Sequence, residues 1–385
     1  MNWEFGNRKW LVGTRALPRQ LNLALAGIFL CAAAGGLWAQ ATKEDPRLQW
    51  RDARELGIEG RGWTDTKDFY DRLPARAEQA VSPNVWNLGH DSAGMCVRFV
   101  TEATTIAAQW NLRRDSLAMP HMPATGVSGL DLYAKEKGVW RWVGNGRPTS
   151  KAEEKFLVRG LKPGRREFLL YLPLYNGVSE VKIGIPPGAT LEPAPPRSAG
   201  MKPIAFYGTS ILQGGCASRP GMAYPAILGR RLNSPTINLG FSGSALSEPE
   251  VAQLLAELDP LVYVLDPLPN MGADLVGKRF EQLVLTLRRA HPQTPIVMVE
   301  NVEYTDGPLV PARAERYTSA NAKLKEIYRR LTKAGQKKLF YVSAARLFGN
   351  DGEATVDGTH PTDLGFLRMA DAIEPSLRRA CLAAR

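Results

Sequence analysis

The sequence contains few histidines and cysteines, four of each among 385 residues. The histidines are dispersed and lack the spacing of metal-ligand motifs, so no metal site is predicted. No Gly-x-Gly-x-x-Gly or P-loop motif follows an apolar run, which argues against the common nucleotide-binding sites. We therefore expect neither a metal nor an organic cofactor.

Long apolar runs are also scarce, and the most prominent one lies near the N-terminus, from Leu21 to Leu37. Basic residues precede this run, and Ala39-Gln40-Ala41 follows it as an A-x-A-like cleavage site. Residues 1–41 are therefore predicted to be a signal peptide, and the mature protein to be exported to the periplasm or secreted. The alternative is an uncleaved N-terminal helix that anchors the chain in a membrane, because the run is close to spanning length.

Acidic residues are outnumbered by basic ones, 38 to 49, which gives a net charge of +11. The basic residues are spread along the chain and accompany no recognition helix, zinc finger or aromatic RNA-binding motif. The excess charge is therefore interpreted as a solvated basic surface, and no nucleic-acid partner is expected.

Cleavage after residue 41 would leave three cysteines, Cys96, Cys216 and Cys381. An exported protein can form a disulfide, but an odd count leaves at least one thiol unpaired. The sequence determines neither the pairing of these cysteines nor the oligomeric state.

Residues 42–192 are predicted to form a β-sandwich or jelly-roll domain, because short apolar runs alternate with turn residues. One turn, Tyr175-Asn176-Gly177, has the Asn-Gly chemistry of a β-hairpin. It predicts that strands at 168–174 and 181–185 pair with each other. The other expected strands lie at 95–101, 106–112, 130–134 and 139–143.

Residues 193–201 are rich in proline and are predicted to be a linker. From residue 202 to 385, five short apolar runs alternate with stretches of helical periodicity. This pattern predicts an α/β domain with a parallel sheet, whose functional residues gather at the carboxyl ends of the strands. The five expected strands lie at 204–207, 236–241, 261–265, 295–299 and 339–342.

Ser210 follows the first of these strands in the string Gly208-Thr209-Ser210. A serine at a strand-to-helix turn can expose its hydroxyl above the sheet, and its amide lies at a helix N-terminus, where anions are favoured. The simpler interpretation is an ordinary helix cap. The Gly-x-Ser-x-Gly motif of α/β-hydrolases is absent, because Leu212 stands two residues after Ser210.

Asp357 and His360 follow the last predicted strand, just before a helix expected to begin near Thr362. A carboxylate three residues before a histidine can bind one imidazole nitrogen and leave the other free as a base. The alternative is an Asp-Gly turn with a surface histidine. The pair nevertheless supplies the base and the acid that Ser210 would need as a nucleophile.

Two further loops offer hydrogen-bond donors, one containing Gly243 after the second strand and one containing Asn270 after the third. With the amide of Ser210, the amide of Gly243 and the side-chain amide of Asn270 would make an oxyanion hole. Alternatively, Gly243 serves a turn and Asn270 caps a loop.

The order Ser210, Gly243, Asn270, His360, with Asp357 as the acid, resembles the SGNH (GDSL-like) hydrolases. The resemblance implies a three-layer, flavodoxin-like catalytic domain. The Asp that usually precedes the serine is replaced by Thr209, and the string from Asp266 to Met271 departs from the usual Gly-x-Asn-Asp block.

The string Gly129-Leu130-Asp131-Leu132-Tyr133 is similar to the GxDLY signature of an N-terminal β domain found before SGNH-type esterase domains. The resemblance implies an exported serine esterase that forms an acyl-enzyme at Ser210. The same resemblance implies acetyl esters of carbohydrates as the expected substrates. The absence of a long apolar lid segment separately favours short acyl groups.

Other functions remain open at this point. The chain could be an inactive carbohydrate-binding protein on a hydrolase scaffold, a lipase or thioesterase, or an enzyme that transfers the acyl group to an alcohol. Arg219 is expected to pair with a surface carboxylate, with binding of a substrate acid as the alternative. The loop from Met119 to Gly126, rich in proline and methionine, either covers the active site or simply connects two strands.

Overall fold

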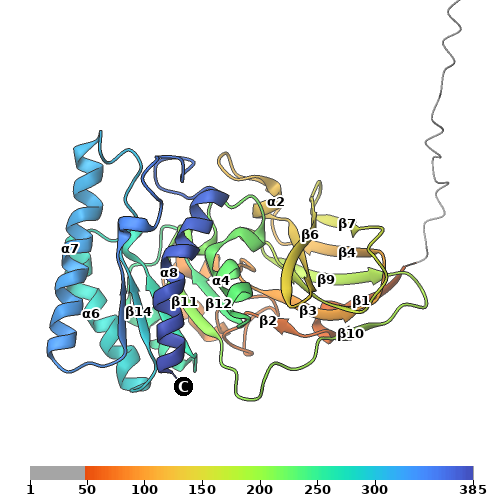
Figure 1. Cartoon of the computed structure of the whole chain (residues 1–385), viewed down its shortest axis with the longest axis horizontal. Helices are drawn as coiled ribbons and strands as arrows, with labels where there is room; N and C mark the ends of the chain where they lie inside the picture. The colour runs from red at the N-terminus through yellow and green to blue at the C-terminus, as the bar shows by residue number, and fades with distance from the viewer. Residues whose placement is uncertain (1–47, 385) are drawn as a thin grey trace, which may run out of the picture. The chain divides into compact units, whose positions relative to one another are not determined.

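Two antiparallel sheets form the N-terminal part of the computed structural model, which describes residues 48–384 (Figure 1). One sheet has the order β1-β9-β4-β7, and the other has the order β10-β3-β8-β5-β6, with β2 also pairing with β3. The strands are β1 (Gln49–Asp52), β2 (Ile58–Glu59), β3 (Cys96–Thr101), β4 (Ile106–Leu112), β5 (Leu130–Glu136), β6 (Val139–Gly146), β7 (Ala152–Val158), β8 (Arg166–Tyr171), β9 (Val178–Ile185) and β10 (Leu191–Pro193).

The two sheets share one apolar core, to which alternate residues of each strand contribute. Val97 and Phe99 of β3 face this core, as do Ala108 and Trp110 of β4. The period of two is the one that a strand with one buried face requires. The predicted β-sandwich is therefore confirmed.

The predicted hairpin at Tyr175-Asn176-Gly177 is wrong, because β8 and β9 belong to different sheets. The segment between them crosses from one sheet to the other. Asn176 is fully buried, and its side chain bonds the amide and the carbonyl of Arg114. An Asn that satisfies backbone groups of a distant loop produces the same local sequence signal as an Asn in a two-residue turn.

A parallel sheet of order β12-β11-β13-β14-β15 forms the second half of the chain. Its strands are β11 (Ile204–Gly208), β12 (Thr236–Gly240), β13 (Val262–Asp266), β14 (Ile296–Val299) and β15 (Leu339–Val342), which confirms the five predicted ones. The helices of this half are α3 (Ser210–Gln213), α4 (Tyr224–Leu232), α5 (Pro249–Glu257), α6 (Ala273–Ala290), α7 (Pro311–Lys333) and α8 (Asp363–Ala383).

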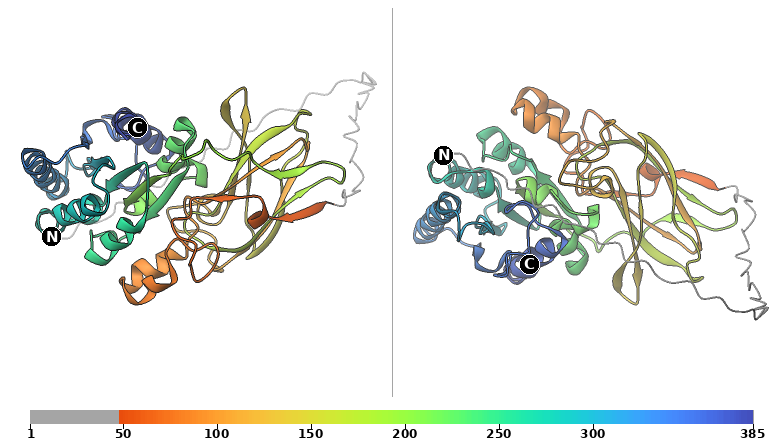
Figure 2. Two further views of the ribbon diagram at one scale, coloured as in Figure 1. Left: turned by 90° about the horizontal axis from the view of Figure 1, so that it is seen from below. Right: turned by 90° about the horizontal axis from the view of Figure 1, so that it is seen from above.

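Helices cover both faces of this sheet (Figure 2). Ala205 and Tyr207 of β11 point into a core shared with α5, α6 and α7. Ile204 and Phe206 point into the opposite core, which α4 and α8 complete. Burial on both faces explains why these strands read as continuous apolar runs. The predicted three-layer α/β fold is confirmed.

The N-terminal part also contributes to both of these cores. Trp86 of the short helix α1 (Pro83–Gly89) packs into the core of α5 to α7. Met122 and Val127, at the ends of a loop that includes helix α2 (Ala124–Val127), pack into the core of α4 and α8. Residues 48–384 accordingly fall within one compact unit.

The predicted signal peptide lies outside the described residues. Within residues 48–384, no helix combines the length and the apolarity needed to cross a membrane.

Candidate active site

Ser210 is the first residue of α3, directly after the carboxyl end of β11. Thr209 is the N-cap of this helix, and its hydroxyl accepts a hydrogen bond from the amide of Ile211 at 3.3 Å. The hydroxyl of Thr209 thus caps α3 at the position where the family pattern has an aspartate. Ser210 is largely buried, and its Oγ lies 2.8 Å from Nε2 of His360.

Asp357 and His360 are held together by a tight turn. One carboxylate oxygen of Asp357 accepts the backbone amides of Thr359, at 3.0 Å, and of His360, at 2.7 Å. The other oxygen lies 2.7 Å from Nδ1 of His360. Gly358 has a positive φ of 85°, which a residue with a side chain adopts only with strain. The local sequence therefore brings the carboxylate onto the imidazole.

The carboxyl group of Asp357 is kept ionised by its neighbours. Partial burial raises its pKa, but hydrogen bonds from the amide and the imidazole of His360 more than offset this, so the pKa lies below its ordinary value. An ionised Asp357 fixes the proton of His360 on Nδ1 and leaves Nε2 as the acceptor that faces Ser210.

The loops of Gly243 and Asn270 follow β12 and β13, the two strands that flank β11. Gly208 at the end of β11 is in register with Gly240 and with Asp266, so all three strands end at the same level. Gly243 has a positive φ of 68°. Nδ2 of Asn270 is buried and has no hydrogen-bond partner within the described part of the chain.

Asp266 leads into the loop of Asn270 and differs sharply from Asp357. It is fully buried, and burial raises its pKa to about 8, although a hydrogen bond from the hydroxyl of Tyr224 at 2.9 Å lowers it in part. Asp266 is therefore largely protonated at neutral pH and adds no negative charge beside the candidate oxyanion donors.

A buried polar network holds the strand ends in place, and the sequence did not reveal it. The guanidinium of Arg72 donates to the carbonyl oxygens of Asn238 and Gly240, at the end of β12, at 3.0 and 2.8 Å. Gln213 accepts the amide of Ser242 at 3.1 Å and donates to the buried carboxylate of Asp91 at 2.8 Å. These contacts connect the helix of Ser210 to the loop of Gly243.

Tyr175 and Gly215 also reach the nucleophile. The Tyr175 hydroxyl donates to the carbonyl oxygen of Ser210 at 3.1 Å. A Cβ at Gly215 would lie 3.1 Å from that oxygen and 3.3 Å from Cδ2 of His360, so a side chain there would crowd the imidazole. Tyr175 comes from the crossing between β8 and β9, and nothing local in its sequence indicates a role at the site.

Asp131 of the GxDLY string makes a structural contact with the hydrolase half. Its Oδ2 accepts hydrogen bonds from Arg219 and from the amide of Gly221, both at 2.8 Å, and its Oδ1 accepts one from the indole of Trp142 at 2.8 Å. Asp131 is fully buried. The partner of Arg219 is thus a buried carboxylate, and the predicted surface pairing is wrong.

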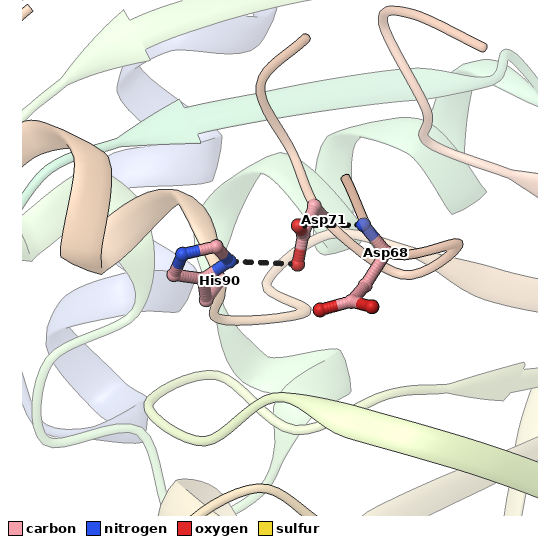
Figure 3. Close-up of side chains that lie close together, drawn as sticks. All are labelled: Asp68, Asp71 and His90. Carbon is pink, nitrogen blue, oxygen red and sulfur yellow. Dashed lines mark hydrogen bonds and ion pairs between the residues drawn. The ribbon is translucent and has the colours of Figure 1, made fainter. Parts of the chain in front are cut away.

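One cluster among the described residues has the composition of a metal site, formed by Asp68, Asp71 and His90 (Figure 3). Nδ1 of His90 lies 2.9 Å from a carboxylate oxygen of Asp71. Arg113 already pairs with both carboxylates, with Asp71 at 3.0 Å and with Asp68 at 2.7 Å. Its guanidinium supplies the positive charge that a cation would bring, so the cluster is explained as an ion-pair network.

Comparisons with protein families identify both halves of the chain. Residues 201–378 match the GDSL-like lipase/acylhydrolase family. Residues 48–191 match the GxDLY domain, the N-terminus of SGNH-hydrolase-type esterases. A search of curated proteins finds no match.

Solved structures resemble the chain over most of its length. A GDSL-like lipase from Bacteroides ovatus is 35% identical, with a TM-score of 0.82 over 86% of this chain and 98% of that one. The salicylyl-acyltransferase SsfX3 from a tetracycline biosynthetic pathway is 19% identical, with a TM-score of 0.70 over 88% and 99%. A family two carbohydrate esterase from Clostridium thermocellum, in complex with cellohexaose, is 16% identical, with a TM-score of 0.55 over 76% and 94%.

The last two likenesses concern the fold alone, whereas the first extends to sequence. Together with the two family matches, it shows that the chain is an ester hydrolase of the GDSL-like lipase/acylhydrolase family, with the GxDLY N-terminal domain of SGNH-type esterases.

Proposed function

We propose that the protein is a serine esterase with Ser210 as nucleophile, His360 as general base and Asp357 as the acid of the triad. The observation that carries this proposal is the hydrogen-bonded chain from Ser210 Oγ to His360 Nε2, at 2.8 Å, and from His360 Nδ1 to Asp357, at 2.7 Å. The first distance is one that a nucleophile and its base require, and the second is one at which a carboxylate can orient that base.

In the first half of the reaction, Ser210 Oγ bonds to the ester carbonyl carbon while His360 Nε2 takes its proton. His360 then donates that proton to the oxygen of the departing alcohol, and the acyl group remains on Ser210. In the second half, water attacks the acyl carbon and passes a proton to His360. His360 then returns this proton to Ser210 Oγ as the bond between Oγ and the acyl carbon breaks, which releases the acid and restores Ser210.

The negative charge that develops on the carbonyl oxygen needs donors that are already in place. We assign this role to the amides of Ser210 and Gly243 and to Nδ2 of Asn270. The unpartnered, buried Nδ2 supports the assignment, because a donor without a partner in the free protein is available to donate a hydrogen bond to the oxyanion in the transition state.

We infer that the acyl group is short, acetyl above all, and that the alcohol is a carbohydrate. The likeness in fold to a carbohydrate esterase solved with cellohexaose favours this class. If the signal peptide predicted at residues 1–41 directs export, the enzyme meets this substrate outside the cytoplasm.

The test is turnover of p-nitrophenyl acetate by the mature protein and by Ser210→Ala, together with labelling by a fluorophosphonate probe. We expect the wild type to hydrolyse the ester and to be labelled at Ser210, and the variant to lose both properties. Retained activity in Ser210→Ala would refute the mechanism, and an unlabelled, inactive wild type would favour a carbohydrate-binding protein on a hydrolase scaffold.

A further inference from the structure

A short hairpin at Met119–Met122 reaches the active site from the N-terminal β part. Two backbone hydrogen bonds between Met119 and Met122, at 3.0 and 3.1 Å, close it, and Pro120 and His121 form its exposed tip. The side chain of Met122 is buried in the core beneath α3. The hairpin is therefore rooted under the nucleophile helix, and its tip is held in place.

His121 at this tip lies beside the proposed base. The ring centroids of His121 and His360 are 5.9 Å apart and the rings are inclined at 51°. Two edges of the His360 ring are occupied by Asp357 and Ser210. The imidazole of His121 has no hydrogen-bond or ion-pair partner among residues 48–384. It is therefore an available donor and acceptor next to the reacting atoms.

The chemistry of an esterase determines which part of the substrate this position meets. His360 must give its proton to the oxygen of the departing alcohol, so that oxygen has to lie within hydrogen-bond reach of Nε2. A side chain beside the ring of His360 consequently adjoins the alcohol and the groups attached to it.

A pocket of about 480 Å³ extends from the same hairpin. Met119 lines it together with Tyr175, whose hydroxyl binds the carbonyl of Ser210, and with Gly243 of the candidate oxyanion hole. The volume lies within the range of small-molecule sites. The pocket thus adjoins the loop of Gly243 and the tyrosine that contacts Ser210, and it offers far more space than an acetyl group needs.

The pocket combines apolar surface, which includes Leu88 and Met119, with several polar side chains. Arg114 is already paired with Asp91 and with the carbonyl of Tyr175, whereas the exposed side chains of Asn84 and Asn87, one turn apart on α1, make no hydrogen bond within residues 48–384. A hydrocarbon chain in this space would remove these groups from water without replacing their hydrogen bonds, which costs free energy. A molecule with several hydroxyl groups would replace them.

We propose that His121 and the pocket lined by Asn84, Asn87 and Arg114 bind the alcohol part of the ester, and that this alcohol is polyhydroxylated, such as a sugar unit. The proposal rests on the proposed function, because it presumes that an ester is cleaved at Ser210. It adds to that function the residues that bind the alcohol part and thereby select the substrate.

The experiment compares two acetyl esters, 6-O-acetylglucose and p-nitrophenyl acetate, by kcat/KM. For His121→Ala we expect the ratio of sugar ester to aryl ester to fall about five- to tenfold, mainly through a higher KM for the sugar ester, as loss of one hydrogen bond predicts. His121→Gln, which keeps a donor and an acceptor, should restore most of the ratio. The double variant Asn84→Ala/Asn87→Ala should lower it independently of the hairpin.

Lys137→Ala is the matched control, because Lys137 is an exposed residue at another hairpin tip of the same β part, between β5 and β6. It should keep the wild-type ratio. A ratio within twofold of the wild type in both His121→Ala and the double Asn variant would overturn the inference while Ser210-dependent turnover still stands. Loss of Ser210 dependence would instead overturn the proposed function.

Discussion

Asn270→Ala is expected to lower kcat while leaving the free energy of unfolding almost unchanged, because Nδ2 of Asn270 has no hydrogen-bond partner in the described chain. Nδ2 of Asn270 is buried and makes no hydrogen bond in the described chain, so its removal breaks no hydrogen bond of the fold. If Nδ2 binds the oxyanion, its loss costs about 2.7–4 kcal/mol of transition-state stabilisation. At about 1.4 kcal/mol per factor of ten, kcat falls on the order of 100- to 1000-fold.

The free energy of unfolding should move little in the same variant. A buried donor without a partner lowers the stability of the fold by about 1–3 kcal/mol. Its removal regains this free energy, and the gain offsets the loss of the packing contacts of the side chain. Asn270→Asp keeps the shape but replaces a donor by a group that repels the oxyanion, and kcat should fall further than in Asn270→Ala.

Asn321→Ala is the control, because Asn321 is a buried asparagine whose side chain, unlike that of Asn270, makes hydrogen bonds within the fold. Its side chain accepts the amide of Asn301 at 2.7 Å and donates to the carbonyl of the same residue at 2.9 Å. This variant should lose about 1–3 kcal/mol of stability and keep kcat within about threefold. Urea unfolding and turnover of p-nitrophenyl acetate measure both quantities. The reasoning fails if Asn270→Ala keeps its kcat or is destabilised as Asn321→Ala is.

Two further predictions concern buried ionisable side chains. Arg72→Met removes a buried guanidinium that binds four backbone carbonyls, and we expect a loss of about 3–5 kcal/mol in denaturant unfolding, against little change for Arg165→Met in an exposed ion pair. The raised pKa of Asp266, about 8, means that the folded protein retains a proton that the unfolded chain releases. The contribution of Asp266 to the free energy of unfolding is therefore complete below about pH 4. It declines as the pH rises to 8, by up to about 1.4 kcal/mol per pH unit. Asp266→Asn should lack this loss, and parallel stability–pH curves for the two proteins would contradict the assignment.

The sequence predicted those parts of the site that local chemistry determines. Asp357 and His360 lie in one turn, and three residues of separation suffice to place the carboxylate on the imidazole. The five parallel strands were evident because burial on both faces leaves an uninterrupted apolar run. The strand ends then identified the loops of Ser210, Gly243 and Asn270 as neighbours.

The remainder of the site depends on contacts between distant segments. Arg72, Tyr175 and His121 reach the hydrolase half from the N-terminal part, and no local pattern distinguishes them from ordinary loop residues. The Asn-Gly string at 176–177 misled for a similar reason, because a turn signal does not state which sheet the next strand joins. The two interpretations of the loop from Met119 to Gly126 were separated only by the position of His121 beside His360.

The buried carboxylate of Asp131 has a consequence for how such proteins can be recombined. It accepts hydrogen bonds from Arg219 and Gly221 of the hydrolase half, so the negative charge that balances Arg219 comes from the GxDLY string of the N-terminal half. A chimaera that carried the hydrolase half behind an unrelated sugar-binding module would lose this anion: a module that covered Arg219 without supplying a carboxylate would leave a buried unpaired charge, which costs several kcal/mol, and one that did not cover it would expose the surface that now packs on Asp131. The two halves are thus expected to be inherited, transplanted and redesigned as one piece.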